Sequence, residues 1–204
     1  MKIKGVIWHH SGGTQADPLA STKHHTAEII DISHKQRWPG FTSNVHRNNK
    51  GDFFHVGYNK VIETTKKRVK ATREIGEETA AARGYNTGYI HICVTGNYDQ
   101  GADTWDASIE PLIYRVWKDI KLEHPHLKIS DNWPHRRVAN KSCFGSSLSD
   151  DHIQNVIARQ AILERDQGVD EALADKRETL MKQVVFLMGQ LVALLKKMND
   201  KKED

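Results

Sequence analysis

The chain has 204 residues, of which 38% are hydrophobic and 27% charged, and this balance excludes a disordered protein. Its length predicts one domain of about 150 residues plus an appendage. The net charge of +4 favours anionic partners such as nucleic acid, anionic lipid or a cell-wall polymer, without choosing among them. Only two cysteines are present, Cys93 and Cys143, so a disulfide framework is not supported.

The first element is a short strand over residues 2–8, which ends at the turn formed by Ser11, Gly12 and Gly13. Two histidines, His9 and His10, follow at its end. Successive strand side chains point to opposite faces, so only one of the two can face a shared site, and the sequence leaves the choice open. Residues 1–7 contain no apolar core of a secretory signal, and we therefore expect a chain that is cytoplasmic as synthesised.

A helix is expected next, capped by Ser21 or Thr22 and running to about Arg37. Three isoleucines are expected on its inner side: Ile29, Ile30 and Ile32. Three histidines on or near this helix are interpreted as solvated or loosely packed: His24, His25 and His34.

Strand-forming residues then occupy positions 53–63, interrupted by one glycine, and residues 66–72 are expected to return as an antiparallel partner. Residues 90–96 form the best strand pattern in the chain, and its largely uncharged composition predicts a central position in the sheet. An amphipathic helix is expected over residues 106–123, with Pro111 in its first turn. Together these elements predict an α/β domain with a mixed central sheet flanked by helices.

The segment 134–145 places His135, Lys141 and Cys143 within one short stretch that ends at a glycine. Imidazole nitrogen and thiolate sulfur are ligand types that zinc takes, and a catalytic zinc needs three protein ligands with a fourth position left to water. This segment therefore offers half of a zinc site, and the pair His9 and His10 is the other conspicuous source of a ligand.

After this segment the composition changes, and we expect domains at residues 1–147 and 148–204. A helix capped by Ser149 is expected to stop at Gly168, followed by a second helix over residues 169–198. That second helix carries two parallel apolar stripes, too short for a membrane span of about 20 residues. Three roles stay open: folding back on the rest of the chain, forming a homo-oligomer as a helical bundle, or binding at a membrane interface.

Four landmarks carry a resemblance to a known family. They are Ile7 to Ser11, then Val56 to Tyr58, then Arg83 to Asn86 followed by residues 90–99, and finally His135 to Cys143. In this order they resemble the zinc-dependent N-acetylmuramoyl-L-alanine amidases, which include bacteriophage endolysins and peptidoglycan recognition proteins. The similarity covers residues 3–145, and the pattern Val-Ala-x-Lys-x-Cys is shared with the small phage amidases.

The resemblance implies a role for individual residues. His9, His135 and Cys143 would hold one Zn²⁺ per chain. Tyr58 would border the water that zinc activates, and Lys141 would lie beside the scissile carbonyl. A second group would line the substrate groove: Arg73, Asn86 and His91.

The implied reaction is hydrolysis of the amide bond between N-acetylmuramic acid and L-alanine, with peptidoglycan as the partner and no nucleic acid or transmembrane segment. The sequence departs from the family pattern at Asn59, Ala81 and Phe144, and Cys93 occupies the strand that supplies a carboxylate in some relatives. Two alternatives remain: a peptidoglycan-binding module of the same fold that does not cut its ligand, and a basic nucleic-acid-binding protein.

Overall fold

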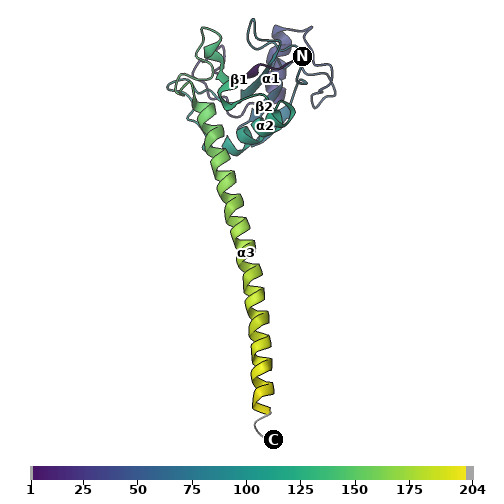
Figure 1. Cartoon of the computed structure of the whole chain (residues 1–204). Coiled ribbons are helices and arrows are strands. Elements are labelled where there is room, and N and C mark those ends of the chain that lie inside the picture. The colour runs from purple at the N-terminus through teal and green to yellow at the C-terminus, as the bar shows by residue number, and fades with distance from the viewer. Residues whose placement is uncertain (1, 201–204) are drawn as a thin grey trace. The chain divides into compact units, whose positions relative to one another are not determined.

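A mixed five-stranded sheet lies at the centre of the first part of the chain in the computed structural model (Figure 1), which describes residues 2–200, and their side chains up to residue 189. The spatial order is β3-β2-β4-β1-β5. The strands are β1 (Gly5–His10), β2 (Lys60–Glu63), β3 (Arg68–Ala71), β4 (Tyr89–Val94) and β5 (Asn132–Pro134). Only β3 runs antiparallel to its neighbour. The predictions of a mixed sheet, a central fourth strand and an antiparallel return are confirmed.

Two helices cover the two faces of this sheet, α1 (Ala27–Arg37) and α2 (Glu110–Glu123). Strand side chains alternate between them. Val6, Trp8 and Ile92 pack with the α2 side, whereas Val61 and Cys93 pack with the α1 side. Each of these side chains is fully buried, and burial of a residue of this size contributes about 1.5–3 kcal/mol.

Helix α1 starts later than the sequence predicts. Thr26 is its N-cap, with a hydroxyl that accepts a hydrogen bond from the backbone of Ile29 at 3.4 Å. The expected cap Thr22 instead donates a hydrogen bond from its hydroxyl to the carbonyl of Gly12 at 2.7 Å. This hydrogen bond fixes the loop after β1. Of the three isoleucines expected on the inner side only Ile30 is buried; Ile29 and Ile32 are exposed.

The strand expected from residue 53 forms only from Lys60 onward. Side chains of α1 take the backbone donors that a ladder would need: Asp31 accepts from the N–H of His55, and His34 accepts from the N–H of Gly57 at 2.9 Å. The segment before β2 is therefore an irregular loop fixed to α1.

The two helices expected after residue 148 are a single helix, α3 (His152–Asp200), so the predicted stop at Gly168 is wrong. A glycine inside a helix costs about 1 kcal/mol relative to alanine, and strong helix formers on both sides carry the helix through it. The contacts divide the chain into units Met1–Gln160 and Ala161–Asp204. The start of α3 belongs to the first unit, where Ile153, Val156 and Ile157 are buried.

In the second unit the large apolar side chains described up to residue 189 are exposed. They include Val169, Leu173, Leu180, Met181, Val184, Val185, Phe186, Leu187 and Met188. Within the described residues no helix has the length and apolarity to cross a bilayer. The domain boundary expected at 147–148 and the homo-oligomer expected through residues 169–198 stay predictions.

Candidate metal centre

Two histidines meet at the carboxyl ends of neighbouring parallel strands. In the register of β1 and β5, Trp8 lies opposite Pro134, so the next residues along the two strands, His9 near the end of β1 and His135 just after β5, lie side by side. Their ring centroids are 4.4 Å apart. The carboxyl end of a parallel sheet is the usual place for a binding site, since the loops that leave it diverge.

Strand alternation separates His9 from His10. His9 lies on the α1 face, beside Tyr58 and His91, with ring centroids at 4.9 and 5.2 Å. His10 lies on the opposite face, where its Nδ1 accepts a hydrogen bond from the backbone of Tyr98 at 3.1 Å. Only His9 of this pair joins the group of possible metal ligands.

Cys143 reaches this group from a loop that Arg136 and Tyr98 hold in shape. The Arg136 guanidinium donates to the carbonyls of Gly145 and Leu148, both at 2.6 Å, and it also pairs with Asp150. Gly145 has φ +95°, and a Cβ there would lie 2.5 Å from the carbonyl oxygen of Tyr98, so only glycine fits.

The resulting donor set fits a zinc ion. The ligand atoms of His9, His135 and Cys143 all lie within 4.8 Å of one another, and Cys143 Sγ is 3.9 Å from His9 Nδ1. Tetrahedral zinc with ordinary bond lengths separates sulfur and nitrogen by roughly 3.6 Å. Two imidazoles and one thiolate leave a fourth position open, which is the arrangement of a catalytic site.

Burial keeps all three donors uncharged. It lowers the pKa of His9 well below its ordinary value, with the neighbouring His91 and His135 adding to the shift, and it lowers the pKa of His135 to about 4. Burial also raises the pKa of Cys143 to about 12. A bound cation reverses the last effect, because a coordinating thiol loses its proton. The two imidazoles therefore stay unprotonated near neutral pH and keep a lone pair that a metal ion can bind.

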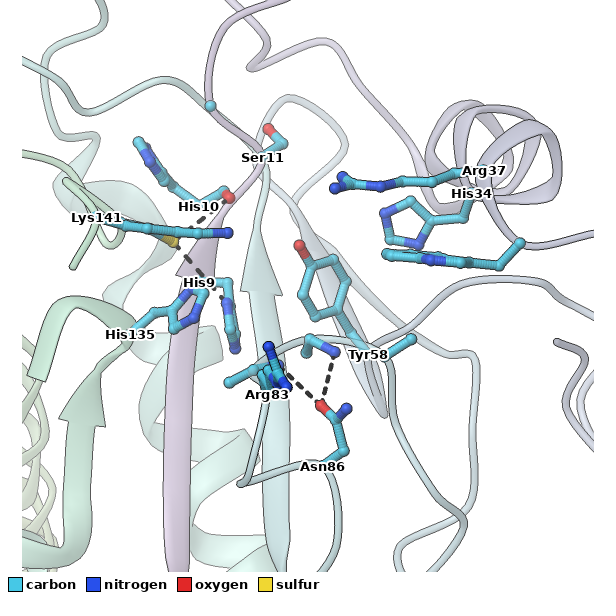
Figure 2. Close-up of a pocket in the computed structure, with 16 residues that line it drawn as sticks. His9, His10, Ser11, His34, Arg37, Tyr58, Arg83, Asn86, His135 and Lys141 are labelled. Carbon is cyan, nitrogen blue, oxygen red and sulfur yellow. Dashed lines mark hydrogen bonds between the residues drawn. The ribbon is translucent and has the colours of Figure 1, made fainter. Parts of the chain in front are cut away.

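The donors lie at one side of a cavity of about 470 Å³. Figure 2 shows Tyr58 between His9 on one side and the α1 residues His34 and Arg37 on the other. Burial, followed by the proximity of Cys93 and Cys143, raises the pKa of Tyr58 well above its ordinary value. Lys141 is exposed at the rim of the same cavity. The structure therefore places Tyr58 and Lys141 along the same cavity as the donor set, and their catalytic roles stay predictions.

The cavity is cationic. Its lining includes Arg37, Arg83 and Lys141 and contains no aspartate or glutamate. The Arg37 guanidinium lies 4.9 Å from the ring centroid of Trp38, which borders the cavity with it. Such a lining favours a ligand that carries carboxylates.

Of the three residues expected to line the groove, one lines the cavity and two are buried outside it. Asn86 does line it, and its side-chain oxygen accepts from the backbones of Ala81 and Ala82 at 3.0 and 2.8 Å. Arg73 is buried outside the cavity, where its Nε donates to the carbonyl of Val56 at 2.8 Å. His91 is fully buried behind His9, so neither Arg73 nor His91 offers a surface to a ligand.

The lining residues that the sequence analysis did not predict include four with large polar or aromatic side chains: His34, Arg37, Trp38 and Arg83. His34 was interpreted as solvated or loosely packed, but its Nδ1 accepts from the backbone of Gly57, and burial lowers its pKa to about 4. The signal that could have found His34, Arg37 and Trp38 is their spacing of three and four along the end of one helix, which places them on one face.

No protein-family model matches the chain, and no curated protein matches it either. Solved structures do. The Ph2119 endolysin from a Thermus scotoductus bacteriophage aligns over 77% of this chain and 86% of its own, with a TM-score of 0.55 and 14% identity. The amidase endolysin LysCS from Clostridium intestinale aligns over 78% of this chain and 84% of its own, with a TM-score of 0.55 and 17% identity. Drosophila PGRP-LB aligns over 72% of this chain and 76% of its own, with a TM-score of 0.53 and 15% identity.

The chain has the fold of the amidase endolysins and peptidoglycan recognition proteins. The resemblance seen in four sequence landmarks is thereby confirmed for the fold, although identity is only 14–17% in these three comparisons. Within this amidase fold the carboxyl ends of β1 and β5 carry two of the candidate metal ligands, His9 and His135, and the loop after β5 carries the third, Cys143. Fold alone does not decide function, which has to be argued from the site.

Proposed function

We propose that the chain is a zinc-dependent peptidoglycan hydrolase that cleaves the amide bond between N-acetylmuramic acid and L-alanine, as a phage-type endolysin. The observation that carries the proposal is the open-sided set of His9, His135 and Cys143 at the wall of a cationic cavity in an amidase fold. A module that only binds its ligand has no need for a metal site with an open position.

His9, His135 and Cys143 would hold the zinc ion. When bound, zinc supplies a Lewis acid that polarises the amide carbonyl and activates water near neutral pH. The protein's part is to fix three ligands on rigid strand ends and a clamped loop, so that the scissile amide meets the metal in one orientation.

Tyr58 and Lys141 would act on the substrate directly. Because the pKa of Tyr58 is raised, the phenol keeps its proton and can donate a hydrogen bond that orients the attacking water or the carbonyl oxygen. The ammonium of Lys141 at the rim stabilises negative charge on that oxygen as the tetrahedral intermediate forms. Cys93 takes no part as a base, since it is fully buried and burial raises its pKa.

The cavity fits the peptide part of the proposed substrate. Stem peptides of peptidoglycan carry free carboxylates, and Arg37 and Arg83 supply cations along the cavity with no competing acid among its lining residues. We expect the protein to meet the cell wall after its release from the cell in which it is made.

The alternative function is peptidoglycan recognition without cleavage. It is favoured by the match to solved recognition proteins, including PGRP-SA from bumblebee, at a TM-score of 0.50 and 20% identity. Such a protein would keep the cavity and bind muropeptides while releasing no product. The two functions share a ligand and differ in turnover.

Release of new amino termini from purified peptidoglycan tests the proposal. Wild-type protein loaded with zinc is expected to liberate L-alanine amino groups, and a chelator or the substitution Cys143→Ser is expected to abolish the release. Tyr58→Phe should keep zinc and lose activity by about 10²- to 10⁴-fold, the usual range for a group that assists proton transfer. Zinc binding without release on several wall types would favour the recognition module, and no zinc binding would exclude both the metal site and the amidase.

A further inference from the structure

The imidazole of His91 lies directly behind the metal ligand His9. His91 is on β4, where it pairs in register with Ile7 of β1, two residues before His9 and on the same face of the sheet. Its Nδ1 is 2.9 Å from Nε2 of His9. Both side chains are buried, with exposures of 0% and 1%, so water does not compete for this hydrogen bond.

The second nitrogen of His91 sets the direction of that hydrogen bond. Nε2 of His91 lies 2.9 Å from the carbonyl oxygen of Tyr85. A carbonyl only accepts, so Nε2 of His91 carries the proton and its Nδ1 is left with a lone pair. His9 must then donate its own Nε2–H to His91. A doubly protonated His91 would place an unpaired cation in a buried position next to the metal site, at high cost.

The hydrogen bond leaves one free nitrogen on His9. With Nε2 protonated and turned toward His91, Nδ1 of His9 carries the lone pair and faces Cys143 Sγ at 3.9 Å. This is the tautomer a metal requires at that nitrogen. In metal sites the second imidazole nitrogen is usually held by such a partner, which fixes the ring and its tautomer.

The backbone of His91 is held as firmly as its ring. Its N–H donates to the side-chain oxygen of Asn59 at 2.8 Å, and its carbonyl accepts from the backbone N–H of Asn59, also at 2.8 Å. The side-chain nitrogen of Asn59 donates in turn to the carbonyl of Glu74 at 2.8 Å. Asn59, one of the departures from the family pattern, thus anchors His91 from the residue next to Tyr58.

We propose that His91 is a positioning residue for the metal ligand His9: it accepts the Nε2 proton of His9, is itself fixed by the carbonyl of Tyr85, and presents Nδ1 of His9 to the metal. The proposal rests on the metal site of the proposed function and gives His91 a role in place of groove contact. Tyr85 lies in the loop that forms one wall of the cavity, so the same relay joins the metal ligand to that wall.

Zinc affinity of purified protein, measured by competition with a chromophoric chelator, tests the relay without any substrate. His91→Leu removes the acceptor and is expected to weaken zinc binding by about 10- to 100-fold, the usual effect of losing such a partner. His91→Asn keeps an acceptor at the δ position and is expected to restore most of the affinity. His55→Leu is the matched control, because His55 is also a buried histidine but lines neither the cavity nor the metal site, so its loss should leave zinc affinity unchanged.

The tautomers can be read directly in the wild-type protein by nitrogen-15 NMR of its histidines, which does not depend on the variants folding. Protons on Nε2 of both His9 and His91 in the zinc-loaded protein are expected. A proton on Nδ1 of His91, or unchanged zinc affinity in folded His91→Leu, would overturn the relay. If wild type binds zinc and cuts peptidoglycan while His91→Leu retains affinity, only the relay fails; if wild type binds no zinc, the proposed function fails with it.

Discussion

At the scale of single residues, the alternation of strand side chains selects the chemistry. His9 and His10 are adjacent in sequence, yet the ring of His9 belongs to the group of metal donors, whereas the ring of His10 accepts a hydrogen bond from the backbone of Tyr98 on the opposite face. The same alternation puts His91 behind His9 and Cys93 beside Tyr58. A shift of one residue in the register of β1 would exchange the two histidines and remove the site.

His34 makes a prediction about acid stability at this scale. Burial lowers its pKa to about 4, whereas an unfolded histidine titrates near 6.5. The unfolded chain therefore binds the proton first, and the stability associated with the neutral ring is complete above pH 6.5 and is lost as the pH falls from 6.5 toward 4. The loss for this residue is at most about 3 kcal/mol.

Denaturant unfolding of chelator-treated protein at pH 7.5 and 4.5 measures this effect. His34→Asn keeps an acceptor for the N–H of Gly57 but cannot take up a proton, so its free energy of unfolding should fall less between the two pH values than that of wild type. An equal fall in both proteins would contradict the assignment.

At the scale of elements, the metal site depends on how a loop is attached to the sheet. The ligand Cys143 is not on a strand, and Arg136 fixes its loop through the carbonyls of Gly145 and Leu148 and through Asp150. Hydrogen bonds from a charged donor each contribute about 1.5–3 kcal/mol. Arg136, the residue directly after the ligand His135, therefore positions the loop that carries the ligand Cys143.

Arg136→Gln is expected to weaken zinc binding and to lower the free energy of unfolding by about 2–3 kcal/mol, since at least one charged hydrogen bond to a buried carbonyl is lost. The matched control is Arg137→Gln, because the Arg137 guanidinium lies 4.8 Å from the ring centroid of Trp133, whereas the hydrogen bonds to the loop carbonyls come from Arg136. Zinc titration and urea unfolding check both. Equal effects from the two substitutions would contradict the clamp.

Much of the fold could be predicted at the level of elements, for a physical reason. The central strand β4, the return of β3 and helix α2 carry strong local patterns in residues 90–96, 66–72 and 106–123. By contrast, β5 has only three residues and ends in Pro134, so its sequence carries no local strand signal. This strand forms because it pairs with β1. The start of α1 shifted because Thr22 has a tertiary partner.

For the same reason, the sequence predicts some residues of the site and not others. The motifs predict five site residues that line one cavity in the structure, although their roles stay predictions: His9, Tyr58, His135, Lys141 and Cys143. The positions of Arg73 and His91 depend on contacts with distant segments, which no local pattern reveals. Cavity residues on α1 were missed because the cavity wall forms only when α1 packs beside Tyr58.

At the scale of the whole molecule, α3 leaves many apolar side chains exposed between residues 161 and 189. An isolated helix is marginally stable in water, and a run of exposed apolar residues marks an interaction surface. Among the roles left open by the sequence, we predict self-association, because Leu173, Leu180, Val184 and Leu187 recur at spacings of seven, four and three.

Light scattering coupled to gel filtration of the full chain checks this prediction. Wild type is expected to be larger than one chain, and the double substitution L180E and L187E is expected to shift it to the monomer. Thr179→Glu adds a charge at another exposed position of the same helix and should leave the assembly intact. A monomeric wild type would contradict self-association and favour a helix that folds back or meets another surface.

The central claim is that this site hydrolyses one particular amide bond, and the most direct test is the fate of oxygen from water. Peptidoglycan digested in H₂¹⁸O and analysed by mass spectrometry should carry one ¹⁸O atom in the lactyl carboxylate of N-acetylmuramic acid, with unlabelled stem peptides that begin at L-alanine. Label at a peptide carboxylate or at a sugar carbon would assign another bond. Intact muropeptide bound to zinc-loaded protein, with no label in any product, would contradict hydrolysis and leave the recognition module.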